Sequence, residues 1–165
     1  MTAAVVPRPG REPERGPGQG PLDAVFVLPA DATLEQAALE LLPTVRGAFC
    51  VTFMDEDTLY AARDPYGVRP LSLGRLDRGW VVASETAALD IVGASFVREG
   101  EPGELLAIDE HGLRSERFAA PEPKGCVFEY VYLARPDATI AGLNVYAARV
   151  DIGRKLAREH PARVL

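Results

Sequence analysis

The sequence has little of what several classes of protein need. It contains only two cysteines, Cys50 and Cys126, among 165 residues, which is too few for a disulfide scaffold and favours a reduced, cytoplasmic setting. Acidic residues outnumber basic ones by 24 to 18, and this balance argues against nucleic-acid binding. No apolar run is long enough to cross a bilayer, and no signal peptide is recognisable. We therefore expect neither a nucleic-acid partner nor a membrane partner.

Familiar catalytic motifs are also missing from the sequence. There is no glycine-rich phosphate loop, no Ser/His/Asp set in a recognisable context and no zinc spacing. The two histidines, His111 and His160, lie far from Cys126 in sequence. The acidic run at residues 55–57 falls in a predicted turn, where acids are usually solvated. By themselves, the residues predict a scaffold without an active site.

Composition divides the chain into three parts. We predict that residues 1–21 are a disordered arm, because residues 7–20 are mainly proline, glycine, arginine and glutamate and offer little to bury. Residues 22–120 carry the patterns of a folded domain. Residues 121–165 begin with the sequence PEPKG, which predicts a domain boundary or a crossing segment.

Hydrophobic periodicity in the middle part predicts a domain dominated by antiparallel strands. Thr33 and Gln36 form a capping-box pattern that predicts a helix ending at Pro43. After Gly47 the spacing of the apolar residues changes from the helical period of about 3.6 to the alternation typical of a strand. Strands are expected at residues 24–28, 48–54, 58–63, 70–74, 79–84, 104–108 and 113–118, with a short helix at 85–92. This arrangement indicates the α+β class.

Two further segments follow the PEPKG sequence. Residues 126–133 form an apolar and aromatic run that predicts a strand. Asn144 precedes a helix that is expected to reach about His160. The residues expected on buried helix faces are Ala87, Ala88 and Ile91 in the short helix and Val145, Ala148, Ile152 and Leu156 in the last one.

Three groups of residues are candidates for chemistry, and each has a structural alternative. Arg63 and Asp64 are expected to form a charge pair at a turn, with Arg69 projecting before a proline; a rigid connection is favoured over a binding role. Cys50 lies mid-strand, which favours a core residue over a nucleophile. Cys126 stands beside an aromatic run, and one cysteine cannot hold a metal. The residues alone identify no catalytic and no cofactor-binding residue.

Five motifs resemble those of a known enzyme family. Residues 62–71 (ARDPYGVRPL) and 82–89 (VASETAAL) resemble class II glutamine amidotransferases. Three later motifs resemble the amidophosphoribosyltransferases among them: EPGE at 101–104, CVFEYVYLARPD at 126–137, and VYAARV at 145–150 with Gly153. The resemblance extends from about Leu34 to about His160.

The resemblance implies a fold and a reaction. The family's glutaminase domain is a four-layer αββα sandwich of the N-terminal-nucleophile hydrolase type, and its nucleophile is an N-terminal cysteine whose α-amino group is the base. Ammonia released from glutamine passes to a phosphoribosyltransferase-type domain. There, with magnesium, it attacks phosphoribosyl pyrophosphate to form phosphoribosylamine, the first step of purine synthesis. The implied partners are thus glutamine and phosphoribosyl pyrophosphate.

This chain departs from the family pattern at both ends. It begins Met1-Thr2-Ala3, without a cysteine to expose. The family's glutamine-binding arginine and Asn-Gly oxyanion pair belong upstream of the part that Gly47 matches, and the phosphoribosyl-pyrophosphate loop would lie beyond Leu165. We therefore expect an incomplete αββα sandwich followed by the start of a phosphoribosyltransferase-type domain, without catalytic residues of its own.

The resemblance also implies one metal ligand. In some family members the cysteine that matches Cys126 is one of four ligands of a structural iron–sulfur cluster. The other three would lie past the end of this chain, so no cofactor is expected for the chain alone, although a cluster and magnesium belong to intact members. Residues 130–137 lie near the family's domain interface and are implied to couple its two sites.

Three hypotheses remain open from the sequence. The first is a truncated amidophosphoribosyltransferase that is inactive alone, with exposed sheet edges and an uncovered apolar face. The second is a non-catalytic interaction module that binds another copy or a complementary chain. The third is one half of a split glutamine amidotransferase whose other subunit carries the N-terminal cysteine.

Overall fold

The computed structural model describes residues 32–161. The predicted arm at residues 1–21 and the predicted strand at 24–28 lie outside the described residues. The described elements are α1 (Leu34–Leu41), the 3₁₀ turn η1 (Leu42–Thr44), β1 (Cys50–Met54), β2 (Leu59–Arg63), β3 (Ser72–Leu76), β4 (Gly79–Ala83), α2 (Thr86–Ile91), β5 (Ser95–Glu99), β6 (Glu104–Asp109), β7 (Gly112–Arg117), the π-helix η2 (Glu129–Leu133), β8 (Thr139–Ile140), β9 (Leu143–Asn144) and α3 (Val145–Glu159).

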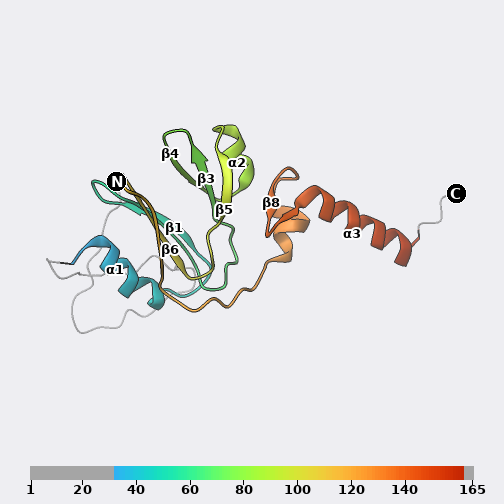
Figure 1. The fold of residues 1–165 in the computed structure, drawn as a ribbon. Coiled ribbons are helices and arrows are strands. Elements are labelled where there is room, and N and C mark those ends of the chain that lie inside the picture. The colour runs from blue at the N-terminus through green and yellow to red at the C-terminus, as the bar shows by residue number, and fades with distance from the viewer. Residues whose placement is uncertain (1–31, 162–165) are drawn as a thin grey trace.

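The larger part of the molecule is built around two antiparallel sheets. One sheet has the strand order β1-β2-β6-β7 and the other β4-β3-β5 (Figure 1). Three hairpins, β1–β2, β3–β4 and β6–β7, join strands that are adjacent in sequence. Each of these hairpins agrees with the strand pattern predicted from the sequence, because alternating residues fix which face each strand buries.

The two faces of the first sheet pack against different layers. Tyr60 and Leu105 lie in a buried cluster with residues of α1 and η1. Ala61 and Leu106, their neighbours along the same strands, lie in a second cluster with Leu73 of β3. Because successive side chains of a strand point to opposite faces, one face carries α1 and the other carries the second sheet.

The helix α2 covers the outer face of the second sheet. Its Leu89 is fully buried, and its methyl groups occupy the space where Gly74 of β3 would carry a Cβ atom. The layer order is therefore α1, first sheet, second sheet, α2. This αββα arrangement is the α+β sandwich expected from the family resemblance.

Helix starts follow the sequence closely. Thr33 caps α1, and the reciprocal bond from the Thr33 amide to Gln36 completes the predicted capping box. Asn144 caps α3 through the amide of Ala147. Within residues 32–161, no helix is both long and apolar enough to span a bilayer.

Residues 127–133 are helical, so the strand predicted at 126–133 is wrong. Val127 and Phe128 are α-helical and continue into η2. Aromatic and β-branched residues favour strands only where a neighbouring strand can pair with them. Here Arg149 of α3 instead donates to the carbonyl oxygens of Tyr130 and Ala134, which supports a helical turn.

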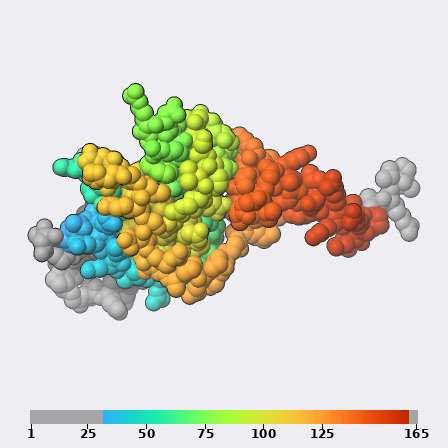
Figure 2. Space-filling view, viewed as in Figure 1, coloured from blue at the N-terminus to red at the C-terminus, as the bar shows by residue number. Residues whose placement is uncertain are grey.

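Two expectations about buried helix faces are also wrong. Ala87 of α2 is buried as predicted, but Ile91 is 76% exposed and Leu89 is buried in its place. Ile152 and Leu156 of α3 are 45% and 57% exposed, because α3 extends away from the sandwich (Figures 1 and 2). The strand β5, which the sequence pattern did not predict, forms an edge of the second sheet.

Candidate functional site

The charged cluster of residues 63–69 folds into a tight turn at the end of β2. Arg63 is 7% exposed and donates to three backbone carbonyls: from Nε to Arg69 at 2.8 Å, and from its Nη atoms to Gly67 at 3.0 Å and Gly100 at 2.7 Å. Its Nη1 atom also lies 3.3 Å from the Glu99 carboxylate. A guanidinium suits this role because its donors form a rigid fork.

Asp64 is fully buried, and its carboxylate accepts hydrogen bonds from backbone amides and not from Arg63. Its carboxylate accepts from the amide of Phe49 at 3.2 Å and from the amide of Tyr66 at 2.9 Å. The predicted charge pair between Arg63 and Asp64 is therefore wrong, since Arg63 pairs with Glu99 across 36 residues of sequence. The favoured interpretation of this motif, a rigid connection held by polar contacts, agrees with this geometry.

Arg69 joins the turn to the C-terminal part of the chain. Its Nη1 atom donates to Glu129 at 2.9 Å, and the Glu129 side chain is 8% exposed. The helical segment that carries Glu129 thus buries its acidic residue, while Phe128, Val131 and Tyr132 are 62%, 53% and 79% exposed. The single glutamate inside an aromatic run is a signal that could have indicated a buried ion pair, but nothing in the local pattern points to Arg69 as its partner.

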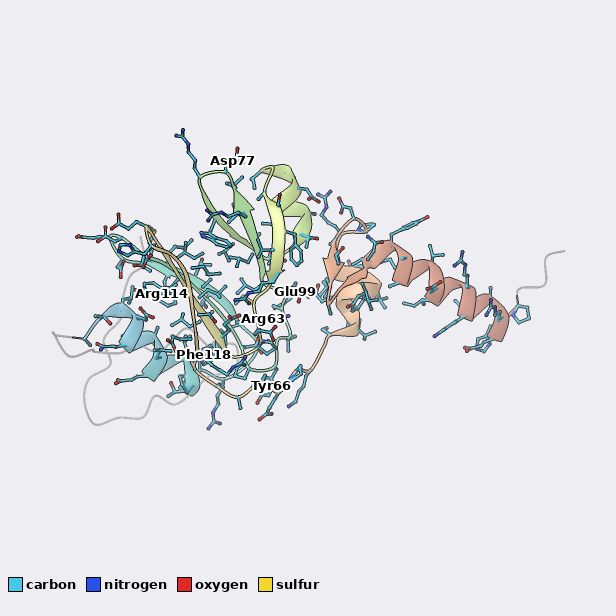
Figure 3. The ribbon with its side chains drawn as sticks, in the orientation of Figure 1. Arg63, Tyr66, Asp77, Glu99, Arg114 and Phe118 are labelled. Carbon is cyan, nitrogen blue, oxygen red and sulfur yellow. The ribbon has the colours of Figure 1, made fainter. Side chains whose placement is uncertain are left out.

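A cavity of about 260 Å³ lies where these segments meet. The end of β2 and the turn after it contribute Arg63 and Tyr66, the end of β5 contributes Glu99, and the C-terminal part contributes Cys126 and Tyr130. Figure 3 shows Arg63, Tyr66 and Glu99 on the side of the sandwich that faces the C-terminal part. The sequence candidates at Arg63 and Cys126 are therefore brought to one cavity.

Within residues 32–161, the Cys50 thiol contacts backbone carbonyl oxygens and not a basic side chain that could activate it. Its thiol points toward the carbonyl oxygens of Arg69 and Pro70 at 3.6 and 3.7 Å, and it packs at the edge of the cluster between the sheets. Burial raises the pKa of the Cys50 thiol to about 11, although Arg63 and Arg69 oppose that change. A thiol with this pKa is almost fully protonated at neutral pH, and a protonated thiol is a poor nucleophile.

We expect Cys50 to resist alkylation in the folded chain. At pH 8 the thiolate fraction at a pKa of about 11 is roughly 100-fold below that of an ordinary cysteine. Iodoacetamide labelling followed by peptide mass spectrometry should show labelling of Cys50 slowed by about that factor relative to the chain in urea. Equal rates in the two states would contradict the placement of this thiol between the sheets.

The described residues do not assemble a metal centre. Both cysteines are free, and no three His, Cys, Asp or Glu side chains gather within residues 32–161. Cys126 is partly buried at the start of the segment that leads into η2. The residues present therefore do not fit a complete iron–sulfur cluster or magnesium site, and Cys126 as one ligand among others stays a prediction.

Comparison with known proteins supports the family resemblance. A glutamine amidotransferase domain model matches residues 23–91. The amidophosphoribosyltransferase of Mycobacterium tuberculosis is 85% identical over 132 residues, which are 80% of this chain and 25% of that protein. The amidophosphoribosyltransferase of Bacillus subtilis is 44% identical over 128 residues, covering 77% of this chain and 27% of that one.

Solved structures agree with these sequence matches. The Bacillus subtilis glutamine phosphoribosylpyrophosphate amidotransferase complexed with ADP and GMP superposes with a TM-score of 0.79 and 42% identity. That match covers 82% of this chain and 30% of the solved one. The chain thus spans about a quarter of the length of the curated relatives it matches. Sequence, layer order and superposition agree, and the chain belongs to the amidophosphoribosyltransferase family of class II glutamine amidotransferases.

Proposed function

We propose that this chain corresponds to a central portion of an amidophosphoribosyltransferase: the second half of its glutaminase domain (22–120), the crossing segment, and the first helix of its transferase domain (121–165). The observation that carries the proposal is 85% identity over 132 residues with one quarter of the Mycobacterium tuberculosis protein. In the complete enzyme the proposed reaction hydrolyses glutamine and uses the ammonia to convert phosphoribosyl pyrophosphate to phosphoribosylamine.

The part played by this portion is structural. The buried turn at Arg63 and Asp64 fixes the end of β2, and the ion pair between Arg69 and Glu129 ties that turn to η2. Side chains that hold a turn by its carbonyl oxygens keep neighbouring strands in register. We propose that the portion supports a glutamine site whose nucleophile, oxyanion donors and substrate-binding arginine come from residues other than the described ones.

The 165-residue chain is therefore expected to release no glutamate from glutamine, because the Cys50 thiol is held protonated by burial. Purified chain should be incubated with glutamine, phosphoribosyl pyrophosphate and magnesium, and glutamate followed with glutamate dehydrogenase. A rate equal to the buffer blank, and unchanged in Cys50→Ala, is the expected result. Glutamate release that disappears in Cys50→Ala would overturn the proposed inactivity.

A complementing chain is the second candidate, favoured by exposed apolar residues. Large apolar side chains are exposed in the C-terminal part, at the end of α2 and on β5: Val127, Phe128, Tyr132, Leu143, Tyr146, Ile91, Val92 and Phe96. Exposed apolar surface of this extent is typical of interfaces. Adding a polypeptide with the upstream residues of the Mycobacterium tuberculosis relative should restore glutamate release if the chain is half of a split enzyme.

Molar mass, measured for the chain alone and in the presence of the upstream polypeptide, distinguishes the remaining alternatives. Light scattering of the chain alone should show a concentration-dependent increase in mass if exposed edges and apolar faces drive self-association. A stable one-to-one complex with the upstream polypeptide, without glutamate release, would favour a non-catalytic interaction module. A monodisperse monomer that does not bind the upstream polypeptide would contradict both self-association and association with a complementing chain.

Cys126 carries a separate proposal. We propose that in a longer family member it is one cysteine ligand of a structural iron–sulfur cluster, the other ligands coming from residues outside this chain. Its partly buried thiol at the edge of the cavity supports this. In such a member, Cys126→Ser should remove iron and the cluster's visible absorption, whereas Cys50→Ala should not.

A further inference from the structure

The apolar cores of the chain do not cross from the sandwich to the C-terminal unit. We call residues 33–120 the sandwich, 121–125 the crossing segment and 126–160 the C-terminal unit. Two buried clusters lie wholly within the sandwich. The third consists of Ala134, Ala138 and Val145, with Tyr130 and Ile140 packed against it, and lies wholly within the C-terminal unit.

Polar contacts instead join the two bodies, the sandwich and the C-terminal unit. The Ala141 amide donates to Glu99 at 2.6 Å, Arg69 donates to Glu129 at 2.9 Å, and the Thr139 amide donates to the Thr86 hydroxyl at 2.9 Å. We call these three the interface hydrogen bonds. Glu99 also contacts Arg63, so it faces both bodies (Figure 3).

The crossing segment is bound along the surface of the sandwich. The amides of Glu122 and Lys124 donate to the carbonyl oxygens of Pro65 and Tyr66, each at 2.8 Å. The Lys124 ammonium lies 4.1 Å from the centre of the Tyr66 ring. Between this segment and the two bodies lies the 260 Å³ cavity, so the interface is not close-packed as a protein core is.

The C-terminal unit has its own internal supports. Arg149 of α3 holds the carbonyl oxygens of Tyr130 and Ala134 at 2.6 and 2.8 Å. The amides of Val145 and Tyr146 donate to Ala138 and Pro136, both at 3.0 Å. These bonds and the third cluster do not involve the sandwich, so the unit can move without losing them.

We propose that the C-terminal unit is a rigid body that swings on the crossing segment, with the interface hydrogen bonds made in the closed state and broken together in the open one. Water can replace the partners of these polar groups on opening, and the three apolar clusters stay intact. Polar interfaces between units of one chain generally permit such relative motion. The proposal does not depend on the proposed function.

Lysine-specific proteolysis of the 165-residue chain provides a direct test. The chain has two lysines, Lys124 in the crossing segment and Lys155 in α3. In the open state the swinging unit also pulls the crossing segment from its bonds to Pro65 and Tyr66, so cleavage after Lys124 reports opening. Cleavage after Lys155 serves as an internal reference within the C-terminal unit. We expect Glu99→Ala and the near-isosteric Thr86→Val each to raise the initial ratio of Lys124 to Lys155 cleavage by about fivefold.

Glu101→Ala is the matched control, because Glu101 lines the same cavity from the sandwich side and its substitution removes the same charge as Glu99→Ala. The cleavage ratio of this control should stay at the wild-type value. An unchanged ratio in both Glu99→Ala and Thr86→Val would overturn the proposal. An equal rise in Glu101→Ala would also overturn it, since local charge and not the interface hydrogen bonds would then control access.

A distance measurement keeps the proposal testable if a variant is less stable. Spin labels at Asp77→Cys, at the tip of the β3–β4 hairpin (Figure 3), and at Arg158→Cys in α3 would report the separation of the bodies in a Cys50→Ala, Cys126→Ser background. Glu99→Ala should add a second, longer population to the distance distribution. A single distribution identical to that of the unmodified interface would contradict the swinging motion.

Discussion

Gly103→Ala should lower the free energy of unfolding by about 3 kcal/mol or more. Gly103 stands just before β6 with a φ of +75°, where an L side chain is strained. A Cβ atom there would overlap the carbonyl oxygen of Ala119. The strain and the overlap act together, so the cost should exceed that of either one.

The backbone at this position cannot relax cheaply. The Gly103 amide donates to the carbonyl oxygens of Arg63 and Asp64 at 3.1 and 3.2 Å, and its own carbonyl oxygen accepts from Phe118 at 3.0 Å. One residue therefore joins the end of β2, the start of β6 and the end of β7. Moving it to admit a methyl group would break hydrogen bonds in three places.

Urea unfolding followed by the fluorescence of Trp80, the single tryptophan, would measure the loss. Gly93→Ala is the matched control, because Gly93 has a φ of +72° but no heavy atom lies within 4 Å of the place that its Cβ atom would take. It should cost about 1 kcal/mol from backbone strain alone. Similar losses in the two variants would show that the contact with Ala119 is not the main cause.

The second large effect is expected at Glu104, whose carboxylate joins the two sheets. Arg98 of β5 donates to both of its oxygens at 2.9 and 2.7 Å, the Glu101 amide donates at 2.6 Å, and the Ser115 hydroxyl of β7 donates as well. The Glu104 side chain is 5% exposed. Glu104→Ala should cost about 3–5 kcal/mol, because it leaves a partly buried guanidinium without its partner.

The same carboxylate should make stability depend on pH in the acid range. Burial alone raises the pKa of Glu104, but the hydrogen bonds from Arg98, Ser115 and the Glu101 amide outweigh it and leave the pKa below its ordinary value of 4.5. A lowered pKa in the folded state means that the stabilisation is present above the unfolded-state pKa and is lost as the pH falls through the folded-state pKa.

Urea titrations of wild type and Glu104→Ala between pH 7 and pH 3 would check both expectations. The difference in unfolding free energy should be largest near pH 7 and should shrink as the pH drops below about 4.5. Glu116→Ala, an exposed glutamate in β7, is the control and should stay within about 0.5 kcal/mol of wild type. A difference that is constant with pH would exclude ionised Glu104 as the source.

Helix caps and hairpin turns could be predicted from the sequence, because their geometry depends on only a few neighbouring residues. The capping box at Thr33, the cap at Asn144 and the hairpins around residues 55–57 and 109–112 appear where short-range rules put them. The place of Cys50 in an alternating strand likewise predicted a core residue, and its side chain packs against the cluster between the sheets. In each case the residues that decide the structure are close together in sequence.

The candidate site was harder to predict because its partners are far apart in sequence. Arg63 was recognised as part of a charged turn, but its pairing with Glu99 needs β5, a strand that the sequence did not indicate. Glu129 and Arg69 lie 60 residues apart, and Arg149 reaches η2 from the last helix. Rules based on local sequence patterns do not predict contacts between residues that are so far apart in sequence.

The sequence by itself determined the α+β class and the hairpins through its periodicity, since local patterns are encoded residue by residue. Its motifs identified the family, and the resemblance to that family implied the sandwich. Only the tertiary structure decided that residues 127–133 are helical and that Leu89, not Ile91, is buried. It alone revealed that the sandwich and the C-terminal unit meet through polar contacts. The physical reason is that burial and hydrogen-bond partners depend on which distant segments come together. Where these partners favour another structure, they override the intrinsic helix or strand propensity of the residues.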